Sequence, residues 1–168
     1  ILPNSALNAV LQHIPGTRPP LGGSHNWHVL IELVQDEAEQ ASPADLAQNL
    51  MAGAMELGLA DDATLSANEA QAEAFWKIRD SISEAERAEG PALQHDISVP
   101  VADMARFIEA ESPVIGARFP GTRIVAFGHL GDGNIHHHVK APKGMAATHY
   151  YGEYGQPITA YVHDRAQA

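Results

Sequence analysis

The stretch Phe127-Gly-His-Leu-Gly-Asp-Gly-Asn-Ile-His-His-His-Val139 decides the fold, because it joins a turn signal to two strand-like runs. Asp-Gly sequences favour the two-residue loop of a β-hairpin. A loop at Asp132-Gly133 places His129 directly opposite His136. The Cβ atoms of such cross-strand neighbours lie about 4.5–5.5 Å apart. The sequence therefore predicts an antiparallel hairpin over 123–139 that carries two imidazoles on one face.

Side chains alternate across a strand, so this hairpin is expected to have one polar and one apolar face. The apolar face is predicted to pack inward, with His137 as a hydrogen-bonded residue at the edge of the core. Two ring nitrogens at this separation can bind one ion at about 2.0–2.2 Å each. A Gly-rich hairpin with two surface histidines would show the same pattern, but we expect a metal or ligand site. The polar face is predicted to carry Phe127, His129, Asn134, His136 and His138.

Helical and strand-like patterns surround the hairpin. Helices are predicted over 5–13 with Ser5 as N-cap, 42–57 with a stop at Gly58, 68–89 and 101–118. Strands are predicted over 27–34, buried at the centre of a sheet, and over 63–65 and 95–99. The segment 143–156 is predicted to be a loop, and 157–168 to begin another helix. This order indicates an α+β fold, and we expect a ferredoxin-like sandwich: an antiparallel sheet with helices packed mainly on one face.

Composition narrows the class of protein. A chain of 168 residues, 45% apolar and 18% charged, fits one globular domain over 1–168. A formal net charge of −11 argues against a nucleic-acid or anionic-membrane partner. The chain has no cysteine, which excludes disulfides and thiolate metal sites. No apolar run approaches the roughly 18 residues of a membrane segment. The first residue is not Met, so we expect an excised fragment of a larger protein.

The predicted helix over 68–89 separates into two faces. Apolar residues at three- and four-residue intervals form a packing stripe, while Arg79 and Ser83 align on the adjacent face. A guanidinium and a hydroxyl four residues apart can both address one carboxylate, which the fork of an Arg matches with two hydrogen bonds. A surface Arg paired with Asp80, Glu84 or Glu86 would show the same pattern.

Three motifs together resemble a known family. Gly128-His-Leu-Gly-Asp-Gly-Asn-Ile-His136 resembles the signature of the C-terminal domain of FAD-linked oxidases, which include D-lactate dehydrogenase, D-2-hydroxyglutarate dehydrogenase and the FAD-binding subunit of glycolate oxidase. Phe75-Trp-Lys-Ile-Arg79 and His95-Asp-Ile-Ser-Val-Pro100 extend the resemblance in the family's order. The resemblance implies a substrate domain of an FAD-dependent oxidoreductase. Its substrate would be a D-2-hydroxy acid of the lactate, glycolate or 2-hydroxyglutarate class, oxidised by hydride transfer to the flavin.

The resemblance also implies roles for single residues. Arg79 and Ser83 would bind the substrate carboxylate, and His129 and His136 would be catalytic residues that hold a divalent metal such as zinc. Gln94 stands where members often carry a Lys, so the chain lacks a second cation for a dicarboxylic acid at that place. The remaining expected substrate contacts are Gln94, Asn134 and His138.

The parts that complete such an enzyme are expected outside this chain. FAD would be bound mainly by an upstream FAD-binding domain, and a Glu-His segment would follow Ala168, so the isolated chain is expected to be inactive. We expect a cytoplasmic enzyme; peripheral membrane association of the full-length enzyme and a homodimer both stay open. The alternatives are a stand-alone metal- or small-ligand-binding module without redox activity, and a metal hydrolase with Asp132 as base. His95 and Asp96 could belong to the family's site or could equally be a pair that closes a turn at the start of a strand.

Overall fold

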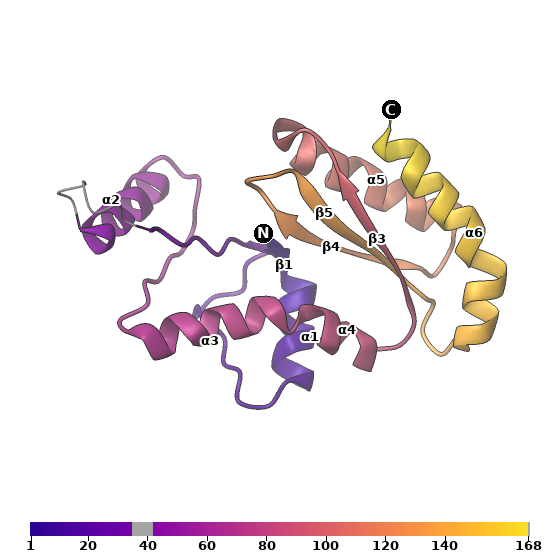
Figure 1. Ribbon diagram of the computed structural model, residues 1–168, viewed down its shortest axis with the longest axis horizontal. Coiled ribbons are helices and arrows are strands. Elements are labelled where there is room, and N and C mark those ends of the chain that lie inside the picture. Colours follow the sequence, from indigo (N-terminus) through magenta and orange to yellow (C-terminus); the bar gives the residue numbers. More distant parts are fainter. Residues whose placement is uncertain (35–41, 168) are drawn as a thin grey trace.

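A computed structural model describes residues 1–34 and 42–167. Its helices and strands are shown in Figure 1. In chain order they are β1 (Leu2–Pro3), α1 (Asn4–His13), β2 (Trp27–His28), α2 (Pro43–Glu56), α3 (Glu69–Asp80), α4 (Ile82–Ala88), β3 (Ala92–Ser98), the 3-10 turn η1 (Val101–Asp103), α5 (Met104–Arg118), β4 (Arg123–His129), β5 (Asn134–Lys140) and α6 (Ala147–Ala166).

The main sheet is antiparallel and has the strand order β3-β5-β4, so β5 lies between the other two strands. Helix α5 connects β3 to β4, which flank β5 and run parallel to one another. This split β-α-β arrangement is typical of ferredoxin-like folds. The predicted α+β class is therefore confirmed, and the strand predicted over 95–99 is β3.

Helices cover both faces of this sheet, whereas we predicted that they would pack mainly on one (Figure 1). Alternate residues of β4 enter two separate cores. Val125 and Phe127 pack with α1, α3 and α4, while Ala126 packs with α5 and α6 on the opposite face. The predicted polar face is therefore partly apolar. Helices α1 and α4 cover it, because they pack against the side chains of Val125 and Phe127.

The hairpin forms as predicted, but its register differs by two residues. Phe127 lies opposite His136, and His129 lies opposite Asn134. The connection uses the four residues Leu130 to Gly133 instead of the two-residue turn that Asp-Gly favours. Because the shift is an even number of residues, every side chain keeps its predicted face.

Helix α6 occupies residues 147–156 of the loop predicted over 143–156 and continues to Ala166 through the helix predicted to begin at 157. Gly and Tyr are weak helix formers, and Pro157 lies inside the helix. Residues spaced four apart nevertheless form one apolar stripe, in which Tyr150, Ile158 and Val162 are buried. The Tyr150 hydroxyl also donates a hydrogen bond to the Val139 carbonyl at 2.6 Å. Packing against the sheet thus outweighs the low helix propensity of this segment.

Four further predictions differ from the structure. The predicted 68–89 helix is broken at Ser81 into α3 and α4, and Ser5 is not an N-cap because α1 begins at Asn4. The residues 63–65 form no strand. Within the described part of 27–34, only Trp27 and His28 pair, with β1. The remaining apolar run has no strand partner here, because apolar character predicts a strand but does not specify its neighbour.

The rest of the N-terminal region contributes little to the main sheet. Helix α2 follows its predicted cap, with the Ala44 amide donating to the Ser42 hydroxyl oxygen at 3.2 Å, and Gly58 ends the turn after it with φ +67°. No residue of α2 is buried, and the helix stands apart from the sheet in Figure 1. Among the described residues, no helix is long and apolar enough to cross a membrane.

Candidate functional site

Arg79 and His129 are in direct contact. Buried Ile78 fixes the last turn of α3 against the core, and the next residue, Arg79, reaches the end of β4. The Arg79 Nη2 atom donates a hydrogen bond to His129 Nε2 at 2.8 Å. The guanidinium carbon also lies 5.4 Å from the centre of the Phe127 ring, within the range of a cation–π contact. Arg79 is therefore held at the hairpin and does not pair with Asp80 or Glu84.

His129 and His136 lie on one face of the hairpin, as predicted. Their ring centres are 5.6 Å apart with the planes inclined at 68°. The two residues are diagonal neighbours and not directly opposite, because the register differs by two. The separation still brings both rings and the Arg79 guanidinium into one cluster of side chains.

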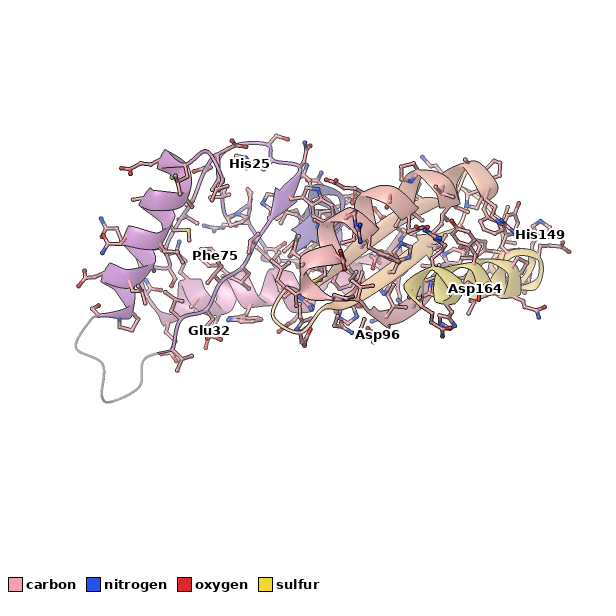
Figure 2. All side chains as sticks on the ribbon, turned by 90° about the horizontal axis from the view of Figure 1, so that it is seen from above. His25, Glu32, Phe75, Asp96, His149 and Asp164 are labelled. Atoms are coloured by element: carbon pink, nitrogen blue, oxygen red, sulfur yellow. The ribbon has the colours of Figure 1, made fainter. Side chains whose placement is uncertain are left out.

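A carboxylate from β3 completes this cluster. Asp96 lies opposite His136 in the sheet, and its Oδ1 lies 2.8 Å from His136 Nδ1. The same oxygen accepts from Asn134 Nδ2 at 3.1 Å. Asp132 caps the hairpin loop by accepting from the Asn134 amide at 3.0 Å, which is the usual role of a turn carboxylate. Figure 2 labels Asp96 on the part of the molecule built from the sheet.

His138 is held in the interior by a second carboxylate. Its Nδ1 lies 2.5 Å from Glu86 Oε2, and only 5% of His138 and 1% of Glu86 are exposed. Lys140 is equally buried; it donates to the Glu86 carbonyl at 2.8 Å and pairs with Glu89 at 3.3 Å. Because Glu86 holds His138 Nδ1, only Nε2 of this ring is left to contact a substrate. The substrate contact of His138 stays a prediction.

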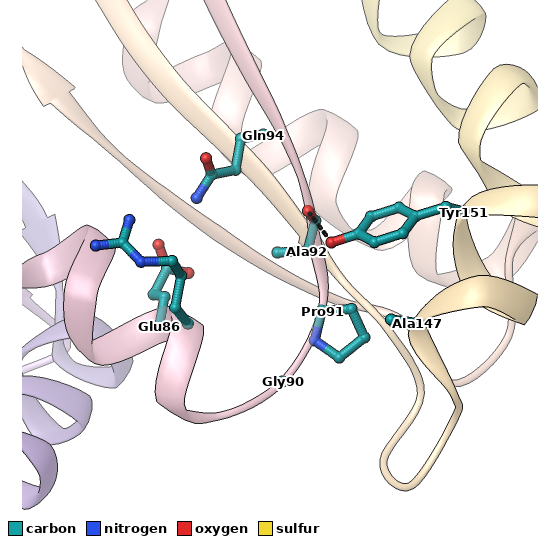
Figure 3. A pocket seen from close by; sticks show the side chains of 8 residues that line it. Glu86, Gly90, Pro91, Ala92, Gln94, Ala147 and Tyr151 are labelled. Atoms are coloured by element: carbon teal, nitrogen blue, oxygen red, sulfur yellow. Dashed lines mark hydrogen bonds between the residues drawn. The ribbon is translucent and has the colours of Figure 1, made fainter.

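Two other residues expected to contact the substrate, Gln94 and Ser83, lie outside this cluster of side chains. Gln94 is exposed on β3 opposite His138, and it lines a cavity of about 420 Å³ with Glu86, Arg87 and Tyr151 (Figure 3). Ser83 is half-buried on α4, and no hydrogen bond from the described residues reaches its side chain. The substrate roles of Gln94 and Ser83 also stay predictions.

The electrostatics of the cluster favour the neutral form of His136. Burial lowers the pKa of His136, and the nearby Arg79 and His129 lower it further, while Asp96 opposes the shift. A neutral imidazole whose Nδ1 donates to a carboxylate has its Nε2 lone pair free to bind a ligand. His137 points to the opposite face, where burial lowers its pKa to about 4. His137 is fully buried and both of its ring nitrogens lack partners, whereas we predicted a hydrogen-bonded residue at the edge of the core.

The donor set fits a divalent metal in part. His136 offers Nε2, and His129 offers Nδ1, or Nε2 when Arg79 moves away. A structural or catalytic zinc needs at least three protein ligands. Among the residues that the structure describes, no group of three or more His, Asp or Glu is placed to hold one ion. The two histidines therefore fit as two ligands of a site that needs at least one more.

Sequence reasoning missed two residues of the site. Asp96 was considered only together with His95, as a pair that closes a turn at the start of a strand. Both residues instead lie within β3, where they point to opposite faces of the sheet. Glu86 was considered only as a possible surface partner of Arg79, although it follows Ile82 by four residues and so occupies a position on the packing stripe. A charged residue at an apolar position was the signal that could have identified it.

The chain is similar to one known family of domains and to several known proteins. A model of the family "FAD linked oxidases, C-terminal domain" matches residues 1–152. The D-2-hydroxyglutarate dehydrogenase of Xanthomonas citri pv. viticola is 33% identical over 138 residues, 82% of this chain and 28% of that protein. The mitochondrial D-2-hydroxyglutarate dehydrogenase of Arabidopsis thaliana is 29% identical over 140 residues, 83% of this chain and 24% of that protein.

A third relative extends the same pattern. The D-2-hydroxyglutarate dehydrogenase of Stutzerimonas stutzeri is 32% identical over 121 residues, 72% of this chain and 26% of that protein. The chain spans about a quarter of the length of these curated relatives. The family match covers all three motifs and the cluster of Arg79, His129 and His136. This chain therefore belongs to the family of C-terminal domains of FAD-linked oxidases.

Proposed function

We propose that this chain is the substrate-binding part of an FAD-dependent enzyme that oxidises a D-2-hydroxy acid. The observation that carries the proposal is the cluster in which Arg79 contacts His129 and His129 lies beside His136. In this cluster the Arg79 guanidinium, which can bind a carboxylate, lies close to two imidazoles that can bind a metal. A small hydroxy acid could therefore contact all three groups. The names of the relatives support the class of substrate, and 2-hydroxyglutarate, lactate and glycolate are the candidates.

Each residue of the cluster has a role in this proposal. Arg79 binds the substrate carboxylate through two of its guanidinium nitrogens and leaves His129 Nε2 as it turns toward the substrate. His129 and His136 hold a divalent ion such as zinc, together with a further ligand from outside the described residues. Such an ion, when bound, lowers the pKa of the substrate hydroxyl. Gln94, Asn134, His138 and Ser83 line the space around the bound acid.

The remaining parts of the enzyme lie outside the described residues. An upstream domain of the same protein would hold FAD, which would supply the hydride acceptor for C2 of the acid, and the hydroxyl proton would pass to a base in the expected Glu-His segment. The hydroxy-acid substrate and that FAD-binding domain are therefore the proposed partners. The acidic net charge of −11 supports the absence of a nucleic-acid partner. A cytoplasmic location and a homodimer stay predictions.

The test is turnover by the full-length protein. A panel of D- and L-2-hydroxy acids is supplied with an artificial electron acceptor, before and after treatment with a chelator. We expect the D-acids alone to be oxidised, and we expect zinc to restore the activity that the chelator removes. Equal oxidation of both enantiomers, or no oxidation of any acid, contradicts the proposal. Zinc binding without turnover by the flavin-loaded protein would favour a binding module instead.

A further inference from the structure

Asp96 is the one group of the side-chain cluster to which the proposed function gives no role. It lies in the middle of β3, between His95 and Ile97, which are both buried on the opposite face. Alternation along the strand therefore turns Asp96 toward the face that carries His136. The register places Asp96 and His136 directly opposite each other.

The contacts of Asp96 fix one atom of the His136 ring. Oδ1 lies 2.8 Å from His136 Nδ1 and accepts a hydrogen bond from Asn134 Nδ2 at 3.1 Å, so two side chains of β5 contact the same oxygen. Asn134 is itself anchored through its amide to Asp132 at 3.0 Å. A ring whose Nδ1 donates to a carboxylate has its proton on that nitrogen, and its Nε2 is then an acceptor.

We propose that Asp96 is a positioning residue that holds His136 as the Nδ1–H tautomer and aims its Nε2 at the bound divalent ion. The inference rests on the proposed function, because it concerns how this chain's own residues prepare one of the two histidine ligands. Carboxylates that orient a ligating histidine in this way change metal affinity by about 10- to 100-fold when they are removed.

A purely structural ion pair would behave differently. The Asp96 side chain is 69% exposed, and exposed pairs contribute little to stability. Loss of the carboxylate should therefore leave the thermal midpoint of the protein nearly unchanged. A large change in zinc affinity at constant stability is then the signature of positioning.

The experiment measures zinc affinity of the full-length protein by competition with a chelator of known affinity. Asp96→Asn removes the charge, and Asp96→Ala removes the acceptor in case the Asn oxygen replaces it. Asp132→Asn is the matched control, because its carboxylate lies on the same hairpin but contacts only a backbone amide. We expect zinc to bind about 10- to 100-fold more weakly to the Asp96→Ala protein. The control should stay within roughly twofold.

A double variant tests whether Asp96 acts through His136. If it does, Asp96→Ala combined with His136→Ala should bind zinc no more weakly than His136→Ala alone. Additive losses would overturn the positioning role. Unchanged zinc affinity in both Asp96 variants, with weaker binding in His129→Ala and His136→Ala, would also overturn it while the proposed metal site stands. Unchanged affinity in all four single variants would refute the metal site and this inference together.

Discussion

Arg79 does not form the ion pair expected of an ordinary surface side chain on a helix. Its guanidinium donates a hydrogen bond to His129 and lies over the Phe127 ring. It forms no ion pair with the acidic residues near it in the sequence. An Arg that donates to a neutral imidazole has no opposite charge to balance it, so it is available to an incoming carboxylate. This contact is the reason to place the substrate carboxylate here.

Replacing Arg79 tests that placement. Arg79→Ala should raise the Michaelis constant for the hydroxy acid, because a charged hydrogen bond is worth about 1.5–3 kcal/mol, or about 10- to 100-fold. Steady-state kinetics of the full-length enzyme provide the measurement. Arg106→Ala on α5 is the control, since Arg106 pairs only with Asp103 at the surface. A Michaelis constant that stays the same in Arg79→Ala would return Arg79 to a surface role.

His137 should make the fold sensitive to acid. Burial lowers its folded pKa to about 4, whereas an unfolded His has a pKa near 6.5, so between these values only the unfolded chain binds the proton. Stability is therefore complete above about pH 6.5 and is lost as the pH falls toward 4, by about 3 kcal/mol from this group. His137→Leu should remove that part of the loss.

Denaturant unfolding at pH 7.5 and at pH 4.5 gives the comparison for His137. We expect the Leu variant to be at least as stable as the natural protein at pH 7.5, because it removes two buried nitrogens without partners. It should then lose less stability on acidification. Parallel losses in both proteins would mean that the carboxylates alone cause the acid sensitivity.

At the scale of elements, the hairpin depends on two glycines. A Cβ on Gly128 would overlap the Asn134 carbonyl oxygen across the strands, and a Cβ on Gly133 would overlap the Val99 carbonyl oxygen at φ +75°. Either Gly→Ala change should destabilise the protein by about 1–3 kcal/mol, because backbone atoms must shift. Gly131→Ala is the matched control, since a Cβ there meets nothing within 4 Å.

Thermal and denaturant unfolding measure these effects, with zinc affinity as the second readout. We expect both destabilised variants to bind zinc more weakly, because β4 carries His129 and β5 carries His136. The control should match the natural protein in both measurements. Equal stability of the Gly128 and Gly131 variants would show that the strands have room to separate.

The elements show which sequence signals were sufficient. Local patterns predicted α1, α2, α5, β3 and the hairpin, because caps, turns and periodicity act over a few residues. The loop length was wrong because Leu130 and Gly131 join the turn, which short-range Asp-Gly preference does not reveal. Helix α6 was missed because its stability comes from Tyr150, Ile158 and Val162 packing on the sheet, which overrides its poor helix formers.

For the whole molecule, local sequence patterns likewise predicted one part of the site, and long-range packing determined the rest. His129 and His136 belong to one hairpin, so local pairing was enough to predict that they share a face. Asp96 and Glu86 reach the histidines only through the β3–β5 pairing and the packing of α4, which no local pattern encodes. Arg79 needed the resemblance to the family, since its spacing from His129 in the chain carries no signal by itself.

The isolated chain of 168 residues should bind no FAD. Its described residues, 1–34 and 42–167, include no Gly-rich pyrophosphate cradle at a helix N-terminus, which is a common way to bind the nucleotide. Absorbance of the purified chain at the flavin band, before and after incubation with FAD, is the measurement. A yellow preparation would show that this domain carries the main flavin contacts itself.

The most direct test of the central claim is flavin reduction in the full-length protein. Anaerobic mixing with a D-2-hydroxy acid should bleach the flavin absorbance, and the L-acid should leave it unchanged. In Arg79→Ala, bleaching should need about 10- to 100-fold more D-acid for the same rate. The account is contradicted if neither enantiomer bleaches the flavin, or if the D-acid does so at the same concentrations with and without Arg79.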